Sequence, residues 1–294
     1  MVRTSDFELL IAEAEAQPFV GWDFSWLAER MVTQPLPWDL GGLVVERARQ
    51  SPDLLDLDTG GGEWLAALAY RPARTVATES YPPNVPLAAR RLHPLDVSVV
   101  RIAGAPDNNV QRVLESQCQL PFRSGSFHLV TNRHASFVAT EVAWILATGG
   151  RFITQQVGDR NDDDFYRLLR LPQPAPSPRP WGLSLAVAQV EAAGLRLLGS
   201  GEGDQVSSFA DVGAFAWYLK AIPWTVPGFS ISAFRRRLED LHARIERYGP
   251  LQVRQSRFWL EATKPIPSAK PVVPGPREQR IGRMEMSSRC PTVA

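Results

Sequence analysis

The chain has 294 residues, a formal net charge of +1 and two cysteines. That length allows one large α/β domain with additions or two small domains, and an apolar content of 44% is ordinary for a soluble globular protein. The balanced charge argues against a large positively charged surface that would bind nucleic acid. Cys118 and Cys290 have no CxxC partner, which argues against a disulfide scaffold and favours a reducing cytoplasm. The sequence shows no signal-peptide or membrane-spanning run, so we expect a cytoplasmic protein without a membrane partner.

Residues 1–50 predict an N-terminal helical cap. Apolar side chains recur at helical spacing over 5–16, and two short helices separated by Pro35 and Pro37 follow. The region also contains a group of aromatic side chains, namely Phe19, Trp22, Phe24, Trp26 and Trp38. These either pack as the core of the short helices or form a lid over a ligand, with Trp22 and Asp23 closing the pocket.

From residue 51 to residue 265 short apolar strands alternate with helices. Strands are predicted at 54–57, 75–79, 97–103, 127–132 and 151–157, after Gly194, and at 256–265. The intervening helices include one over 140–150, which Gly149 and Gly150 would close, and later ones within 209–224 and 231–249. This alternation is typical of an α/β fold with helices on both faces of a sheet. We therefore predict a doubly wound, mostly parallel sheet of seven strands, followed by a disordered tail at 266–294.

The first strand of this region leads into a glycine turn, LLDLDTGGGEWL over 54–65. Such a turn faces the carboxyl edge of the sheet, where ligands bind, and glycine lets the backbone approach a ligand closely. The sequence contains neither GxxxxGK[ST] nor GxGxxG at this turn, and Glu63 would compete with a phosphate for the helix start. Phosphate recognition is therefore disfavoured.

An acidic residue at the end of the second strand is placed to bind a ligand that lies over the glycine turn. Glu79 ends that strand, 17 residues after Gly62, and a carboxylate there can accept hydrogen bonds from both hydroxyls of a ribose. A glycine turn with a ribose acid and without phosphate recognition suits an adenosyl cofactor.

At this point the chain resembles the class I S-adenosylmethionine-dependent methyltransferases. Four pieces in chain order carry the resemblance, which is sharpest over 54–158: LLDLDTGGGE, TVATES, LPFRSGSFHLVTNRH and EVAWILATGGRFITQQVG. More narrowly, the chain is similar to bacterial methyltransferase-like proteins of unassigned substrate, through GWDFS at 21–25, ATESYPPN at 77–84, NRH at 132–134 and TQQVG at 154–158. The resemblance implies a Rossmann-like methyltransferase fold and S-adenosyl-L-methionine as cofactor.

The resemblance also implies roles for single residues. Asp56 would orient the glycine turn and the amino group of the cofactor, and Glu79 would bind the ribose. Ser80 and Tyr81 either flank the adenine or are ordinary loop residues. The cofactor-binding set implied by the family is Asp56, Asp58, Thr59, Gly60, Gly61, Gly62, Glu79, Ser80, Gln117, Asn132 and Arg133.

Two positions depart from the family pattern. Asp58 stands where the family has glycine, and its side chain either crowds the methionine moiety or pairs with its ammonium group. The usual acid near the adenine amino group is not obvious, so Glu115, Ser116 or Gln117 would have to serve.

His134 is the candidate catalytic residue. It follows the fourth predicted strand, where substrate meets the methyl group, and the usual pKa of histidine suits a general base for a protonated acceptor. The alternative is that His134 only shapes the pocket. Asn132 and Arg133 would line the cofactor or an acidic substrate group, although Arg133 could equally pair with Glu141.

The sequence therefore predicts an S-adenosylmethionine-dependent methyltransferase that acts on a small molecule, as a monomer or homodimer. Near-neutral charge and abundant aromatics favour a small-molecule acceptor over RNA, whose methylation is the alternative activity. The alternative outside the enzymes is a non-catalytic binding module with a degenerate cofactor site. The hypothesis of an NAD-dependent oxidoreductase is weak because the GxGxxG motif is absent. No metal is predicted, because His93, His128 and His242 lack ligand spacing.

Overall fold

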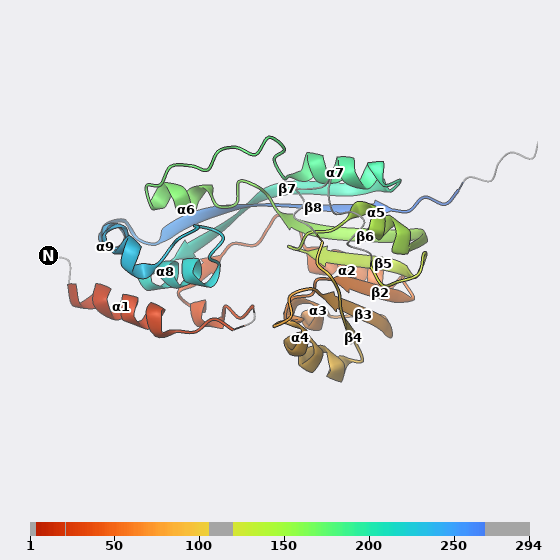
Figure 1. Cartoon of the computed structure of the whole chain (residues 1–294), viewed down its shortest axis with the longest axis horizontal. Helices are drawn as coiled ribbons and strands as arrows, with labels where there is room; N and C mark the ends of the chain where they lie inside the picture. Colours follow the sequence, from red (N-terminus) through yellow and green to blue (C-terminus); the bar gives the residue numbers. More distant parts are fainter. Residues whose placement is uncertain (1–3, 21, 106–119, 268–294) are drawn as a thin grey trace, which may run out of the picture.

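The computed structural model describes residues 4–20, 22–105 and 120–267, and its centre is one sheet with the strand order β1-β7-β8-β6-β5-β2-β3-β4 (Figure 1). The strands are β1 Met31–Thr33, β2 Asp53–Leu57, β3 Arg74–Glu79, β4 Ser98–Arg101, β5 Phe127–Arg133, β6 Leu146–Val157, β7 Arg196–Phe209 and β8 Leu251–Thr263.

Five neighbouring strands of this sheet, β4, β3, β2, β5 and β6, run parallel to one another. Beyond β6 the direction alternates, since β8 is antiparallel to β6 and to β7, and β1 is antiparallel to β7. The sheet has eight strands because β1, in the segment predicted to be helical, pairs Met31 with Phe209 at the edge. The prediction of seven strands missed this short strand. The carboxyl ends of the parallel strands all meet at one edge, where the site is built.

Helices cover both faces of the parallel strands. The helices of the described residues are α1 Thr4–Ala16, α2 Leu40–Ala48, α3 Glu63–Ala67, α4 Val85–Leu92, α5 Ala139–Ile145, α6 Asp163–Leu168, α7 Leu183–Ala192, α8 Val212–Ala221 and α9 Ile231–Tyr248, with short 3-10 turns at Ser25–Leu27 and His93–Leu95. Figure 1 shows α5 and α7 on one face and α2, α3 and α4 on the other.

Strand β2 shows why the sheet is buried on both faces. Its five residues are all buried, and successive side chains of a strand point to opposite faces. Leu54 packs with Leu40 and Val44 of α2, whereas Leu55 packs in the cluster that contains Val190 of α7. A continuous apolar run such as LLDL is what a parallel strand with two covered faces requires.

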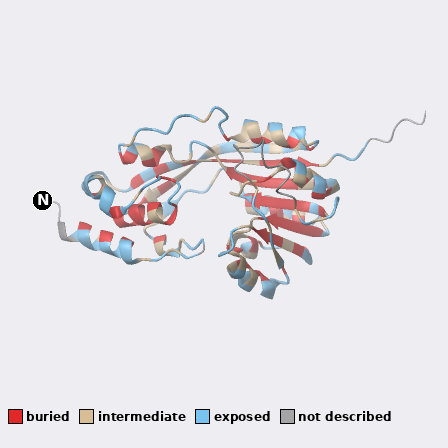
Figure 2. Ribbon diagram, viewed as in Figure 1, coloured by how far each residue is buried: buried red, intermediate tan, exposed pale blue. Residues whose placement is uncertain are grey.

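Strands β7 and β8, of 14 and 13 residues, extend past the parallel strands and carry a second lobe. Helices α1, α6, α8 and α9 surround this extension at the left of Figure 1, and Figure 2 shows that it has a buried interior of its own. Its core includes Phe7, Phe165, Phe209 and Trp217. The predicted cap over 1–50 is thus divided in space, because α1 packs in the second lobe and α2 packs on the sheet.

Alternate positions of β7 are glycine because large side chains lie across them. A Cβ at Gly199 or Gly201 would approach the ring of Trp259, at 3.2 and 2.8 Å respectively. A Cβ at Gly203 would meet Pro37 and Trp38, both at 3.5 Å. These glycines therefore serve packing on the face of the sheet that also carries α2.

One predicted boundary was wrong. The helix predicted over 140–150 ends at Ile145, and Leu146 already has extended backbone angles. Gly149 has a φ of +78° but does not cap a helix, because its N–H donates to the Lys264 carbonyl oxygen at 2.8 Å and places it in the ladder with β8. Pairing with the neighbouring strand β8 therefore outweighed the helical spacing of the apolar residues in this segment.

Most of the predicted tail, residues 268–294, lies outside the described residues. Within the described part of the chain, no helix combines the length and the apolar composition that a bilayer span requires.

Candidate functional site

A cavity of about 370 Å³ opens at the carboxyl ends of β2, β3 and β5. Its walls come from the glycine turn, the end of β3, the loop after β5 and one tryptophan of the N-terminal segment. The lining residues are Trp22, Asp58, Thr59, Gly60, Glu63, Trp64, Glu79, Ser80, Asn84, Gly104, Ala105, Arg133, His134, Ala135 and Ser136.

Two glycines of the turn have different reasons to be glycine. Gly60 has a φ of +67°, and a Cβ there would meet no atom within 4 Å, so its open side faces the cavity. Gly62 has a φ of +81°, and its Cβ would come within 2.9 Å of Leu92. Gly60 is therefore open to a ligand, and Gly62 is required by packing against α4. Gly61 and Gly62 do not line the cavity.

Glu79 is tied to the glycine turn from the neighbouring strand. One carboxylate oxygen accepts the N–H of Gly60 at 2.6 Å, and the other accepts the N–H of Tyr81 at 2.7 Å. Glu79 is 3% exposed, and burial raises the pKa of its carboxyl above the ordinary value despite these bonds. Each oxygen keeps a further lone pair, so the carboxylate can still accept two donors from the cavity.

Asp58 lies at the floor of the cavity with a left-handed backbone, at a φ of +53°. Its N–H donates to the Thr78 hydroxyl at 3.1 Å, and a hydrogen bond from Ser80 reaches its carboxyl. The other carboxyl oxygen, Oδ1, is buried and has no hydrogen-bond partner among the described residues. Burial raises the pKa of the Asp58 carboxyl.

Two predicted residues lie beneath the cavity and do not line it. Asp56 accepts a hydrogen bond from the Thr131 hydroxyl at 2.8 Å, and its complete burial raises its pKa to about 6. Asn132 donates to the Leu57 carbonyl oxygen at 3.2 Å and accepts from Gln156 at 2.6 Å. Both side chains connect β2 to its neighbours under the glycine turn.

Arg133 ends β5, His134 follows it, and both residues line the cavity. The guanidinium of Arg133 lies 6.0 Å from the ring centre of Trp64 and does not pair with Glu141, whose carboxylate accepts the Leu120 N–H. His134 has a φ of +62°, and its N–H donates to the Gln155 carbonyl oxygen at 2.8 Å. The left-handed turn at His134 redirects its side chain over the end of β6.

A hydrogen-bond relay behind the cavity holds the imidazole. The Trp38 indole N–H donates to Gln155 Oε1 at 2.8 Å, and Gln155 Nε2 lies 2.9 Å from His134 Nε2. The pKa of His134 is held well below its ordinary value, first by burial and then by the positive charges of Arg133 and Arg257. His134 is therefore neutral at physiological pH.

Trp22 is the part of the N-terminal segment that reaches the cavity. It is 42% exposed and stacks on Trp224 with ring centres 6.0 Å apart, so the second lobe supports it. Asp23 does not line the cavity, because its carboxylate accepts the Ser25 N–H at 2.8 Å. The neighbours Phe19 and Phe24 pack against the core of the second lobe.

Some predictions fall outside the described residues and some lining residues were not predicted. Glu115, Ser116 and Gln117, the candidates beside the adenine, lie in the segment that the structure does not describe. Trp64 and Asn84 were missed as lining residues. Their position in the sequence could have indicated this role, because each lies at the start of a helix that follows a strand leading to the ligand-binding edge of the sheet.

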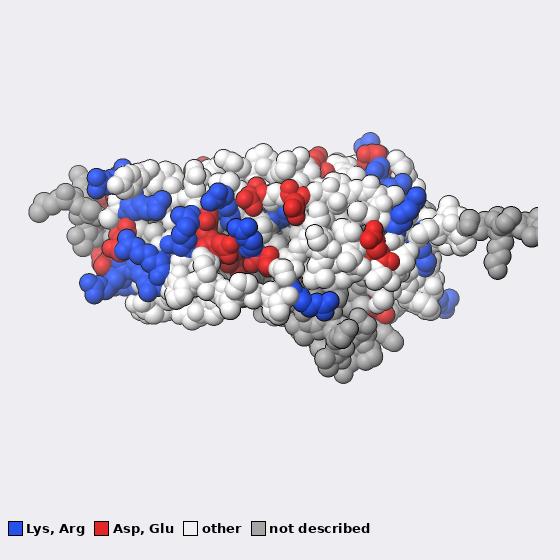
Figure 3. Space-filling view, turned by 90° about the horizontal axis from the view of Figure 1, so that it is seen from above, with Lys and Arg blue, Asp and Glu red and all other residues white. Residues whose placement is uncertain are grey.

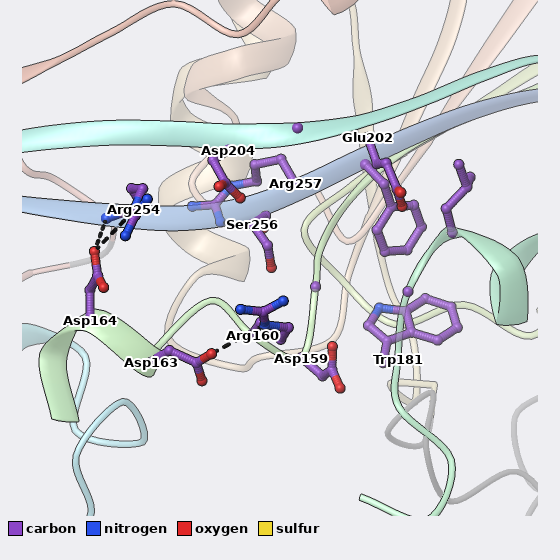
Figure 4. A pocket seen from close by; sticks show the side chains of 15 residues that line it. Asp159, Arg160, Asp163, Asp164, Trp181, Glu202, Asp204, Arg254, Ser256 and Arg257 are labelled. Atoms are coloured by element: carbon purple, nitrogen blue, oxygen red, sulfur yellow. Dashed lines mark hydrogen bonds and ion pairs between the residues drawn. The ribbon is translucent and has the colours of Figure 1, made fainter. Parts of the chain in front are cut away.

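A second cavity, of about 480 Å³, lies between α6, the start of α7 and the β7–β8 ribbon (Figure 4). Charged side chains surround it, and several of them pair with one another. Asp164 accepts the backbone N–H of Arg254 at 2.9 Å and lies 3.6 Å from its guanidinium, and Arg160 contacts Asp163 at 3.3 Å. The sequence did not predict this cavity.

Comparison with solved structures identifies the fold. A provisionally assigned methyltransferase from Bacillus halodurans C-125 is similar over 78% of this chain and 99% of its own, with 20% identity and a TM-score of 0.51. This chain has the fold of the methyltransferases. No protein-family model and no curated protein matches the sequence.

Two further solved structures align at lower TM-scores. A functionally unknown protein from Deinococcus radiodurans R1 has 14% identity over 89% of this chain and all of its own, with a TM-score of 0.49. Geranyl diphosphate methyltransferase, solved with S-adenosylmethionine, has 12% identity over 76% of this chain and 84% of its own, with a TM-score of 0.43.

Proposed function

We propose that this protein is an S-adenosylmethionine-dependent methyltransferase that acts on a small molecule. The observation that carries the proposal is the bond between Gly60 and Glu79 at the wall of an open cavity. It places a carboxylate with spare lone pairs beside a backbone that a ligand can approach. This is the arrangement that a ribose over a glycine turn requires.

The residues of the cavity fit this cofactor. Glu79 would accept the two ribose hydroxyls, and the open side of Gly60 leaves room for the chain between ribose and methionine. The unpartnered Oδ1 of Asp58 would accept the ammonium group, and Arg133 would bind the carboxylate. S-adenosylmethionine supplies an electrophilic methyl group on a sulfonium. A diphosphate fits less well, because Glu63 occupies the start of α3 with its carboxylate paired to Arg91.

The remaining residues exclude water and limit what can enter. Trp22 and Trp64 provide apolar walls on two sides of the cavity, and Trp22 is supported by Trp224. In-line transfer depends mainly on holding the nucleophile at roughly 3 Å from the methyl carbon, so walls that restrict orientation contribute directly to rate.

A small acceptor is favoured over RNA by the charge distribution. On the face of the molecule in Figure 3, acidic side chains lie among the basic ones. RNA binding would need a strip of uncompensated positive charge, and the chain as a whole carries a net charge of only +1.

Calorimetric titration with S-adenosylmethionine, S-adenosylhomocysteine and NAD tests the proposal. We expect micromolar dissociation constants for both adenosyl compounds and none for NAD. Glu79→Ala should weaken binding at least about 100-fold, because two hydroxyl contacts to a buried carboxylate are lost together. Glu202→Ala, a matched change at the second cavity, should leave the affinity unchanged. No binding at millimolar cofactor, or equal loss in both variants, would refute the proposal.

A further inference from the structure

The relay behind the cavity determines which way the Gln155 amide faces. The Trp38 indole N–H lies 2.8 Å from one end of that amide. An indole N–H can only donate a hydrogen bond, so this end must be the amide oxygen. The NH₂ group at the other end then faces His134, whose Nε2 lies 2.9 Å away. Trp38 thus prevents the two ends of the amide from changing places.

The amide in turn determines which nitrogen of His134 carries a proton. An NH₂ group can only donate, so Nε2 has to accept and is not protonated. The ring is therefore neutral, which agrees with a pKa that burial holds well below the ordinary value. In a neutral imidazole whose Nε2 is an acceptor, the proton is on Nδ1. His134 is thus a hydrogen-bond donor at Nδ1.

The Nδ1–H group of His134 is open to a ligand. The imidazole lines the cavity, whereas Gln155, which holds Nε2, does not. Nδ1 has no hydrogen-bond partner in the described part of the chain and is not enclosed by it. The donor therefore faces whatever fills the cavity. This differs from the general base that the sequence predicts, because a base at this position needs a free lone pair on Nδ1.

One group of the proposed cofactor suits this donor. Outside the ribose and the adenine, the hydrogen-bond acceptors of S-adenosylmethionine are its carboxylate oxygens. Arg133, the residue proposed to bind that carboxylate, is the neighbour of His134 in the chain and lines the same cavity. The unpartnered Oδ1 of Asp58 would repel a carboxylate and suits the ammonium group. An N–H aimed at the nucleophilic atom of a methyl acceptor would instead occupy the lone pair that attacks the methyl carbon.

We propose that His134 is a hydrogen-bond donor that binds the carboxylate of the cofactor beside Arg133, an inference that rests on the proposed function. Trp38 and Gln155 are positioning residues for this contact, because they act only through the imidazole. A hydrogen bond to a carboxylate is stronger than one between neutral groups, and two neighbouring donors restrict how the carboxylate lies. The cofactor site thus extends to Trp38, which does not line the cavity.

The ring tautomer can be measured without any ligand. Nitrogen-15 spectra of the histidine side chains should show His134 neutral, with its proton on Nδ1, from about pH 6 to about pH 8. Gln155→Leu should remove that preference. Gln255→Leu is the matched control and should keep it, since Gln255 is also 4% exposed but is bonded to Tyr218. An Nε2–H tautomer or an imidazolium at neutral pH in the wild-type protein would overturn the donor role.

Trp38→Phe tests the first step of the relay. Without the indole N–H, the Gln155 amide can reverse, so the share of His134 with its proton on Nδ1 should fall. Trp144→Phe is the control, because Trp144 donates its indole N–H to the Phe122 carbonyl oxygen at 3.4 Å and lies outside the cavity. That variant should leave the His134 spectrum unchanged. An unchanged tautomer in Trp38→Phe would refute the positioning role of Trp38.

Two substitutions of equal size distinguish a donor from an acceptor at position 134. His134 has a φ of +62°, a conformation that asparagine and aspartate tolerate better than most residues. His134→Asn keeps an N–H donor on a side chain of the same length as the path to Nδ1, and His134→Asp replaces that donor by an anion. We expect His134→Asp to weaken the binding of S-adenosylhomocysteine at least about twentyfold more than His134→Asn does. Calorimetric titration measures both affinities.

5′-Methylthioadenosine, which lacks the amino-acid part of the cofactor, locates the contact. Its affinity should be the same within about twofold in His134→Asn and His134→Asp, because the proposed contact is to the carboxylate alone. Equal affinity of the two variants for S-adenosylhomocysteine, or an equal difference for both compounds, would overturn the carboxylate contact. Thermal denaturation identifies a variant that fails to fold, and the wild-type tautomer tests the donor role without any substitution.

The proposed function and this inference can fail separately. Binding of neither adenosyl compound to the wild-type protein would refute the proposed function, and the carboxylate contact with it. Tight binding of S-adenosylhomocysteine to both His134 variants would refute the contact and leave the proposed function standing. An Nε2–H tautomer in a protein that binds the cofactor would refute the donor role and favour the general base instead.

Discussion

Asp56 and Asp58 are two residues apart, yet they have different surroundings. Asp56 is enclosed beneath the glycine turn, and its pKa is raised to about 6 by burial. It therefore binds its proton more tightly in the folded protein than in the unfolded chain. Its contribution to stability is present below the unfolded pKa of about 3.8 and is lost as the pH rises through about 6.

Asp56→Asn removes this titration and should change the pH dependence of stability. Measured by urea unfolding, the stability difference between variant and wild type should shift in favour of the variant by about 2 kcal/mol from about pH 4.5 to about pH 8. Other titrating groups cancel in that difference. The same difference at both pH values would show that Asp56 has an ordinary pKa.

Asp58 combines a strained backbone with an unpartnered oxygen at the cavity floor. Asp58→Gly should stabilise the protein by about 1 kcal/mol, because glycine adopts a φ of +53° without strain. It should also weaken S-adenosylmethionine binding about tenfold, since the partner of the ammonium group is lost. Asp96→Gly is the control, because Asp96 has a φ of +57° but lies outside the cavity. A gain of cofactor affinity in Asp58→Gly would instead support a degenerate site in a non-catalytic module.

At the scale of elements, the glycines of β7 allow a test of whether the space beside Trp259 must stay free of a side chain. A Cβ at Gly201 would lie 2.8 Å from the Trp259 indole nitrogen, whereas a Cβ at Gly182 would meet nothing within 4 Å. Gly201→Ala should lower the free energy of unfolding by about 1–3 kcal/mol, and Gly182→Ala should change it by less than about 0.5 kcal/mol. Chemical denaturation measures both. Equal effects would mean that Trp259 moves aside freely.

The parallel strands could be predicted from sequence because their signals are local. The run LLDL before three glycines and the run TVATE ending in an acid both indicate strands that lead to the ligand edge, and β2 and β3 are found there. The end of α5 could not be predicted in this way. Gly149 lies in the ladder with β8, and its partner Lys264 is more than a hundred residues away.

The site was predictable only in part for the same reason. Gly60 and Glu79 stand in motifs with a fixed place in the fold, and the structure brings them into contact. The relay from Trp38 through Gln155 to His134 joins three distant segments, and each residue alone suggests only an aromatic, an amide or a base. The general-base role of His134 remains a prediction.

At the scale of the whole molecule, the second lobe supports the site through Trp22 and Trp224 but keeps its own core. Phe7 of α1 is buried in that core, whereas Leu9 on the same helix is exposed. Phe7→Ala should destabilise the protein by about 3 kcal/mol, and Leu9→Ala by less than about 0.5 kcal/mol. Calorimetric titration of folded Phe7→Ala should still give the wild-type cofactor affinity within about twofold. A larger loss would mean that α1 shapes the cavity.

Hydrogen exchange with and without S-adenosylhomocysteine tests the central claim most directly, because it reports both binding and location. We predict slower exchange in peptides that cover the glycine turn at 56–64, the end of β3 at 77–84 and the loop at 130–136, which together line the cavity. Segment 158–164, beside the second cavity, should exchange unchanged. Protection confined to 158–164, or no protection at saturating ligand, would contradict a cofactor site between Gly60 and Glu79.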